Sequence, residues 1–151
     1  WYLRNTYREN NLIKPGVVVL DGVLLDLGRI TLDIYAVGAE KDHIVPWDSA
    51  WRIVQLAGGK VRYVLASSGH IAGTINPASK GKRSYWVNAS ATADPDKWLA
   101  GAKEIPGSWW SEWSKWLKPH GGKQVAARKK LGGGRRKPIE PAPGRYAKER
   151  A

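Results

Sequence analysis

The strongest constraint on the fold lies between residues 30 and 70, where an amphipathic helix pattern separates two strand patterns. In "ITLDIYAVGAE" (30–40), apolar and polar residues alternate at first and the rest is mainly apolar, which predicts a strand buried over most of its surface. Val61–Ala66 predicts a second strand. Between them, "VPWDSAWRIVQLAGG" (45–59) predicts a helix that stops at its two glycines. A helix between two strands makes them parallel neighbours through a right-handed crossover, so we expect an α/β fold.

Two residues with chemically active side chains follow these strands. Asp42 comes just after the first strand and His70 just after the second. The carboxyl ends of parallel strands share one edge of the sheet, where open α/β sheets bind ligands, so we expect the two side chains to meet. A carboxylate that accepts from one imidazole nitrogen fixes the tautomer and leaves the other nitrogen free as a base. The order acid, then histidine, is that of the α/β-hydrolases, whose nucleophile comes earlier in the chain.

Simpler interpretations of these residues remain open at this point. Asp42 lies four residues before Pro46 and could instead satisfy backbone donors at a helix start. His70 follows Gly69 and could be a turn residue. We interpret His43 as a structural residue or a support for the pair, and His120 as a solvated residue.

The composition excludes several classes of protein. The chain of 151 residues has no Cys, so it contains no disulfide, thiolate metal site or cysteine nucleophile. It starts at Trp1 and has no Met, and we interpret it as the C-terminal piece of a longer protein. No run approaches the roughly 18 apolar residues of a membrane span, and no signal peptide is evident. We therefore expect a cytoplasmic protein without a membrane span, and we expect neither a cofactor nor a metal.

Positive charge is concentrated near the C-terminus. From Lys118 onward there are 11 basic and 2 acidic residues, against 25 and 13 in the whole chain. This segment is rich in Gly and Pro and has few apolar residues to offset the entropy of ordering. We therefore divide the chain into a body, 1–117, and a basic linker and tail, 118–151. A nucleic-acid-binding module is a weak alternative, because the tail lacks interleaved aromatic residues and supports only salt-sensitive, sequence-independent binding.

Two further segments of the body have clear local patterns. "VVVLDGVLLDL" (17–27) predicts a β-hairpin around Asp21 and Gly22, preceded by a short helical segment. "GSWWSEWSKWL" (107–117) predicts a helix that begins after Ser108. The large apolar residues on one face of this helix are Trp109, Trp110, Trp113, Trp116 and Leu117. Such a face packs on the domain, or it contacts an apolar surface outside the chain.

Several motifs in the same order carry a family resemblance. "EKDHIVPW", "SSGHIAGTINP", "KRSYWVN", "KWLAGA", "GSWWSEWSKWL" and "EPAPGRYAKERA" resemble the C-terminal part of class I polyhydroxyalkanoate synthases. The resemblance implies the last strands and helices of an α/β-hydrolase domain, and an acyltransferase that polymerises (R)-3-hydroxyacyl-CoA into polyester with release of CoA. It implies a Cys-Asp-His triad in which Asp42 and His70 are catalytic, with the Cys located before Trp1.

The resemblance also implies how the chain works and with what. The partners would be the acyl-CoA substrate, the growing polyester, a storage granule surface and, for the full-length enzyme, a second subunit in a homodimer. The aromatic face of 107–117 could then contact polymer or granule. Asp42 either helps to activate the hydroxyl of the incoming monomer or only orients His70. Without the Cys, we expect the chain alone to be inactive. An esterase or depolymerase of the same fold is the alternative function.

Overall fold

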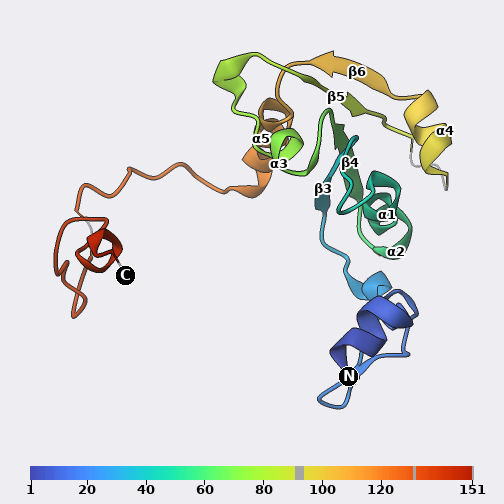
Figure 1. Ribbon diagram of the computed structural model, residues 1–151, viewed down its shortest axis with the longest axis horizontal. Helices are drawn as coiled ribbons and strands as arrows, with labels where there is room; N and C mark the ends of the chain where they lie inside the picture. Colours follow the sequence, from blue (N-terminus) through green and yellow to red (C-terminus); the bar gives the residue numbers. More distant parts are fainter. Residues whose placement is uncertain (91–93, 131, 151) are drawn as a thin grey trace. The chain divides into compact units, whose positions relative to one another are not determined.

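The computed structural model (Figure 1) describes residues 1–90, 94–130 and 132–150. The chain forms two compact units, Trp1–His120 and Gly121–Ala151. The first unit therefore extends slightly past Leu117, because Lys118–His120 forms a 3₁₀-helix, η5, directly after the last α-helix.

Short elements make up the beginning of the first unit. They are the π-helix η1 (Arg4–Arg8), the 3₁₀-helix η2 (Asn11–Ile13), the strands β1 (Val19–Leu20) and β2 (Val23–Leu24), and the 3₁₀-helix η3 (Leu27–Arg29). β1 and β2 pair antiparallel, which confirms the predicted hairpin. Asp21 and Gly22 have φ values of 47° and 76°. This turn matches the twist of the strands and favours Asp-Gly, because both central residues need a positive φ.

A mixed sheet of four strands forms the centre of the first unit. The strands are β3 (Ile34–Ala39), β4 (Val61–Ala66), β5 (Ser84–Val87) and β6 (Lys103–Pro106), in that order across the sheet. β3 and β4 are parallel, as predicted, and the other neighbours are antiparallel. β3 starts four residues later than the predicted strand, and β4 has the predicted bounds. The α/β class is thus confirmed for the part of the chain that the structure describes.

The helix predicted for residues 45–59 is present but shorter, and it is divided in two. It forms α1 (Trp47–Trp51) and α2 (Ile53–Leu56). Arg52 lies between them and donates its N–H to the carbonyl of Ser49, three residues back, at 3.3 Å. A bond to the third residue back is tighter than the α-helical one, so the helix is interrupted there.

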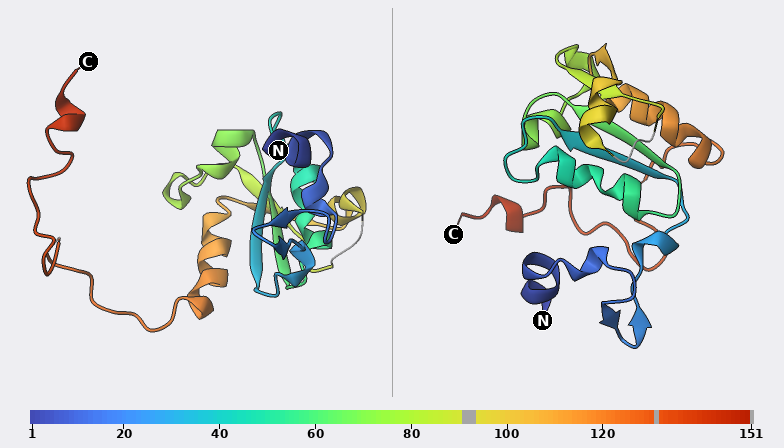
Figure 2. Two further views of the ribbon diagram at one scale, coloured as in Figure 1. Left: turned by 90° about the horizontal axis from the view of Figure 1, so that it is seen from below. Right: turned by 90° about the vertical axis from the view of Figure 1, so that its right-hand side faces the viewer.

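Helices cover both faces of the sheet (Figure 2). α1, α2 and α4 (Pro95–Ala100) cover one face, over a core of Trp51, Tyr63, Leu65 and Trp98. α3 (His70–Thr74) and α5 (Trp110–Leu117) lie on the other face, over Val64, Ala66, Tyr85 and Trp109. β4 supplies residues to both cores, because successive side chains of a strand point to opposite faces.

The tryptophan-rich helix α5 begins at Trp110, one residue later than predicted, although the Ser108 hydroxyl does accept the N–H of Trp110 at 3.1 Å. The aromatic face of α5 and its N-cap residue packs mainly on the domain. Trp109 is buried, and Trp116 lies 5.3 Å from Tyr35 between ring centroids. Trp113 and Leu117 keep 40% of their surface exposed. The packing interpretation therefore holds for Trp109 and Trp116.

His120 is not the freely solvated residue that was predicted. Its ring stacks on Trp116 with centroids 4.5 Å apart, and its Nε2 lies 3.6 Å from Oδ2 of Asp33. η5 continues the chain directly from α5, so His120 lies beside the residue four positions earlier.

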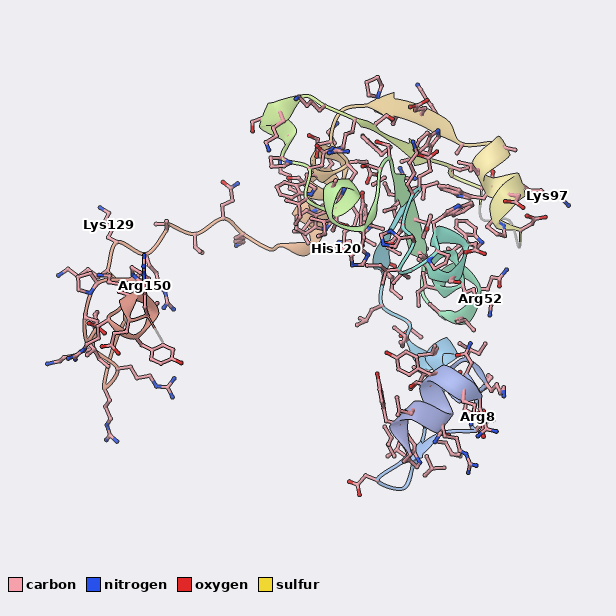
Figure 3. The ribbon with its side chains drawn as sticks, in the orientation of Figure 1. Arg8, Arg52, Lys97, His120, Lys129 and Arg150 are labelled. Carbon is pink, nitrogen blue, oxygen red and sulfur yellow. The ribbon has the colours of Figure 1, made fainter. Side chains whose placement is uncertain are left out.

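The second unit, Gly121–Ala151, has little regular structure. Among its described residues it contains a bridge between Gly133 and Arg136 and the 3₁₀-helix η6 (Tyr146–Lys148). The Glu140 carboxylate accepts the backbone N–H of Arg145 at 3.2 Å. Basic side chains such as Lys129 and Arg150 are exposed (Figure 3). Within the described part of the chain, no helix is both long and apolar enough to cross a bilayer.

The packing of α1 on β3 generates a prediction about Gly38. A Cβ atom at Gly38 would lie 2.0 Å from the hydroxyl oxygen of Tyr63, which donates to the carbonyl of Trp47 at 2.9 Å. Gly38→Ala should therefore lower the free energy of unfolding by about 1–3 kcal/mol, through overpacking and loss of this hydrogen bond. Urea denaturation of the purified protein measures the change. Gly133→Ala is the matched control, since its Cβ would meet nothing within 4 Å; equal effects would contradict the prediction.

Candidate functional site

Backbone hydrogen bonds continue past the ends of β3 and β4 and hold the two following loops together. Glu40 donates its N–H to the carbonyl of Ala66 at 2.8 Å, and Lys41 donates to Ser68 at 3.0 Å. The strands are in register to their last residues, where Ala39 is paired with Ala66. The loops that carry Asp42 and His70 therefore lie side by side at one edge of the sheet.

The two side chains predicted to meet do meet. Oδ2 of Asp42 lies 2.7 Å from Nδ1 of His70. Oδ1 of Asp42 accepts the backbone N–H groups of Ile44 and Val45, both at 2.9 Å. These donors belong to the loop before α1, which begins at Trp47. Oδ1 of Asp42 thus satisfies donors of the loop before the helix, not of the helix start itself, and Oδ2 pairs with His70.

The surroundings of Asp42 keep its carboxylate ionised. The hydrogen bond from the Val45 N–H, together with those from His70 and Ile44, lowers the pKa of Asp42 from 3.8 to about 2, against the opposing effect of desolvation. Only 8% of this side chain is exposed. A depressed pKa stabilises the folded state above pH 3.8, and that contribution is lost as the pH falls towards 2. At neutral pH Asp42 is therefore a charged acceptor.

His70 presents its second ring nitrogen away from Asp42. Because ionised Asp42 can only accept, the neutral imidazole must carry its proton on Nδ1, which leaves Nε2 as an acceptor. Nε2 has no hydrogen-bond partner among the described residues, and 45% of the side chain is exposed. The pair can therefore act as an oriented general base.

The backbone is strained two residues before His70. Ser68 has a φ of 84°, a region that residues with a side chain rarely adopt. Its carbonyl accepts the N–H of Lys41, so the bond between the two loops holds this conformation. Residues of this kind cluster at functional sites, where the surrounding structure maintains them.

Large aliphatic side chains adjoin both members of the pair along the chain. Ile44 and Val45 follow Asp42 and are 62% and 46% exposed. Ile71 and Ile75 follow His70 and are 73% and 60% exposed. An apolar surrounding of this type suits an acyl group better than a charged or strongly polar ligand.

The structure does not bring His43 into the pair. His43 is exposed, and it forms no hydrogen bond or ion pair with another described residue. Nor do any three His, Cys, Asp or Glu side chains in residues 1–90, 94–130 and 132–150 form a group that could hold a metal ion.

One polar network of the first unit was missed by sequence reasoning. Tyr35 donates its hydroxyl to Glu112 of α5, and Arg62 contacts the same carboxylate through Nε and Nη2 at 2.9 and 2.8 Å. Burial, and then Glu112, raise the pKa of Tyr35. Tyr35 and Arg62 are paired in the β3–β4 register, but no pattern in the sequence indicates their shared partner.

Comparisons with known proteins give relatives along the whole chain. The chain is 48% identical over 151 residues to "Poly(3-hydroxyalkanoate) polymerase subunit PhaC" of Cupriavidus necator, covering 100% of the chain and 26% of the relative. It is 42% identical over 150 residues to the protein of the same name in Rhizobium etli, covering 99% and 23%. For "Poly(3-hydroxyalkanoate) polymerase 2" of Ectopseudomonas oleovorans the identity is 40% over 144 residues, covering 95% and 26%.

No family model matches the chain. The chain spans about a quarter of the length of the curated relatives that it matches. The family resemblance predicted from the motifs is confirmed by these relatives, whose aligned regions cover 95–100% of the chain. Over nearly its whole length the chain is thus a homologue of a segment of the poly(3-hydroxyalkanoate) polymerases.

Proposed function

We propose that this chain supplies the acid–base pair, Asp42 and His70, of an α/β-hydrolase-type acyltransferase that joins (R)-3-hydroxyacyl-CoA units into polyester and releases CoA. The observation that carries the proposal is the contact of 2.7 Å between Oδ2 of Asp42 and Nδ1 of His70, with the ring partly exposed. The names of the relatives support the substrate class, since they are poly(3-hydroxyalkanoate) polymerases. An esterase or depolymerase would use the same pair, but no named relative favours it.

The chemistry needs a base for two successive proton transfers. A thiol with a pKa of about 8.5 is mostly protonated at neutral pH, so Nε2 of His70 takes its proton. The thiolate attacks the thioester carbonyl, the bond from carbonyl carbon to CoA sulfur breaks, and CoA leaves with a proton from His70. The 3-hydroxyl of the next unit then attacks the acyl-enzyme carbonyl while His70 accepts its proton. The bond from the carbonyl carbon to the enzyme sulfur breaks, and the enzyme thiol leaves with that proton from His70. The attacking thiol has to come from outside these 151 residues, because they contain no Cys.

The geometry supports an orienting role for Asp42. Its two oxygens are engaged, one by His70 and the other by the N–H groups of Ile44 and Val45. Oδ2 still has a free lone pair, but only 8% of the Asp42 side chain is exposed, so an incoming hydroxyl has poor access to the carboxylate. Asp42 therefore acts through His70 in both transfers, and it stabilises the imidazolium that forms in each.

The exposed aliphatic residues beside the pair, including Ile44 and Ile71, would contact the acyl group or the growing polyester. The full-length protein would be a homodimer, would lie in the cytoplasm and would associate with polyester granules. The basic tail would at most add electrostatic attraction to polyanions. A role for His43 beside the pair has no supporting contact.

The chain by itself should release no CoA from 3-hydroxybutyryl-CoA. The reason is chemical, since a base without a thiol or an activated hydroxyl has no group to convert into a nucleophile. Free thiol formation, followed with a chromogenic disulfide reagent, measures the reaction. Turnover by the purified 151 residues at more than the background rate of hydrolysis would contradict the proposal.

His70→Ala in the full-length protein should remove the base and lower the rate of CoA release by at least about 100-fold. His43→Ala is the matched control, because it removes the same ring one residue from Asp42 and should leave the rate within about twofold. Initial rates of CoA release, at equal amounts of folded protein, give both values. Retained activity in His70→Ala would disprove the assignment of the base.

Asp42→Asn should slow the first acylation and the later elongation by the same factor. The amide still accepts hydrogen bonds at Oδ1, but it loses the charge that fixes the tautomer of His70, and both steps use that tautomer. Single-turnover acylation and steady-state polymerisation by the full-length protein measure the two factors. A larger loss in elongation alone would show that Asp42 acts on the hydroxyl directly.

A further inference from the structure

The helix that begins with His70 is too short to hold itself in place. α3 contains five residues, His70–Thr74. A helix of this length is unstable in isolation, and the carbonyl groups of its last turn have no partners within the helix. The position of the His70 ring therefore depends on contacts that α3 makes with the rest of the unit.

Two neighbouring tryptophans supply the missing partners at the end of α3. The indole Nε1 of Trp109 donates to the carbonyl of Gly73 at 2.9 Å, in a buried position. The indole Nε1 of Trp110 donates to the carbonyl of Thr74 at 3.0 Å. Just beyond the helix, the Ser108 hydroxyl donates to the carbonyl of Asn76. Three consecutive residues thus bind the C-terminal end of α3 and the turn after it.

Gly73 fixes how closely α3 approaches the sheet. A Cβ atom at this position would lie 3.0 Å from Cβ of Ala39 and 3.1 Å from the carbonyl oxygen of Ser67. α3 therefore rests on the end of β3, three residues before Asp42. Within α3, the Thr74 hydroxyl donates back to the carbonyl of His70 at 2.6 Å. The two ends of the helix are thus linked to each other.

The tryptophans come from a segment that is itself anchored. Trp109 is 9% exposed and packs in the core with Val64 and Tyr85. One turn further along, Glu112 forms the ion pair with Arg62, and the two side chains are only 19% and 30% exposed. The indole donors therefore have fixed positions relative to β4, the strand that leads to His70.

We propose that Trp109 and Trp110 are positioning residues for the His70 base. The indole N–H groups fix the C-terminal end of α3. The hydrogen bond with Asp42 fixes the His70 ring at the N-terminal end of the same helix. Together these bonds determine where Nε2 of His70 points. The proposal rests on the proposed function of His70. A displacement of about 1 Å at a catalytic group lowers a rate by roughly 100-fold, so small shifts of α3 matter.

The test uses Trp109→Phe and Trp110→Phe in the full-length polymerase. Phenylalanine keeps an aromatic ring in place and removes the donor. Each variant should lower kcat for CoA release by roughly 10-fold or more, with little change in KM, because binding of the substrate does not involve the indoles. Trp113→Phe is the matched control, since Trp113 lies on the same helix and makes no hydrogen bond to α3. Its kcat should stay within about twofold of the original protein.

A spectroscopic measurement separates positioning from loss of stability. With ¹⁵N-labelled histidine, the Nδ1–H proton of His70 that faces Asp42 should give a downfield NMR signal, assigned by its absence in His70→Gln. The signal should weaken or shift in Trp109→Phe and Trp110→Phe but not in Trp113→Phe. Tm and the amount of folded protein are measured on the same samples. Trp110 is only partly buried, so its variant tests the idea even if Trp109→Phe folds poorly.

The outcomes distinguish this inference from the proposed function. If His70→Ala abolishes activity while both tryptophan variants keep the kcat and the NMR signal of the control, the positioning role is overturned and the base remains. A lower Tm with unchanged kcat per folded molecule overturns it as well, because it shows a structural role only. If His70→Ala retains activity, the proposed function itself fails.

Discussion

The parallel pairing of β3 with β4 is the constraint on which the candidate site depends. The last residues of the two strands, Ala39 and Ala66, are paired in register, and two further backbone hydrogen bonds extend the contact into the loops. Asp42 and His70, 28 positions apart in the sequence, come within 2.7 Å because of it. A shift of one residue in the register would turn side chains to the opposite face and separate the pair.

Asp42 combines two roles that are often given to different residues. One oxygen accepts two backbone N–H groups and so gives the loop before α1 its shape. The other oxygen holds the ring of His70. The same bonds that build the loop also lower the pKa of the carboxyl, so the local structure and the charge state of the site have a common cause.

The aromatic residues have roles that composition does not reveal. Trp51 and Trp98 fill the core on one face of the sheet. On the other face, Trp109 is part of the core and also donates to α3, whereas Trp113 on the same helix is 40% exposed. Helical spacing predicts that these side chains share a face, but only their distance from the sheet decides which are buried.

Local sequence patterns were sufficient to predict the parallel strand pair, the hairpin and the edge of the sheet at which the site forms. A strand, a helix and a strand in succession require a parallel pair, and the Asp21–Gly22 turn requires a hairpin, because these follow from periodicity and backbone sterics. Tertiary structure alone decided the antiparallel strands β5 and β6, the bond from Trp109 to Gly73 and the stacking of His120 on Trp116. Most of these contacts join residues distant in the chain, and all of them depend on how whole elements pack, for which no local propensity exists.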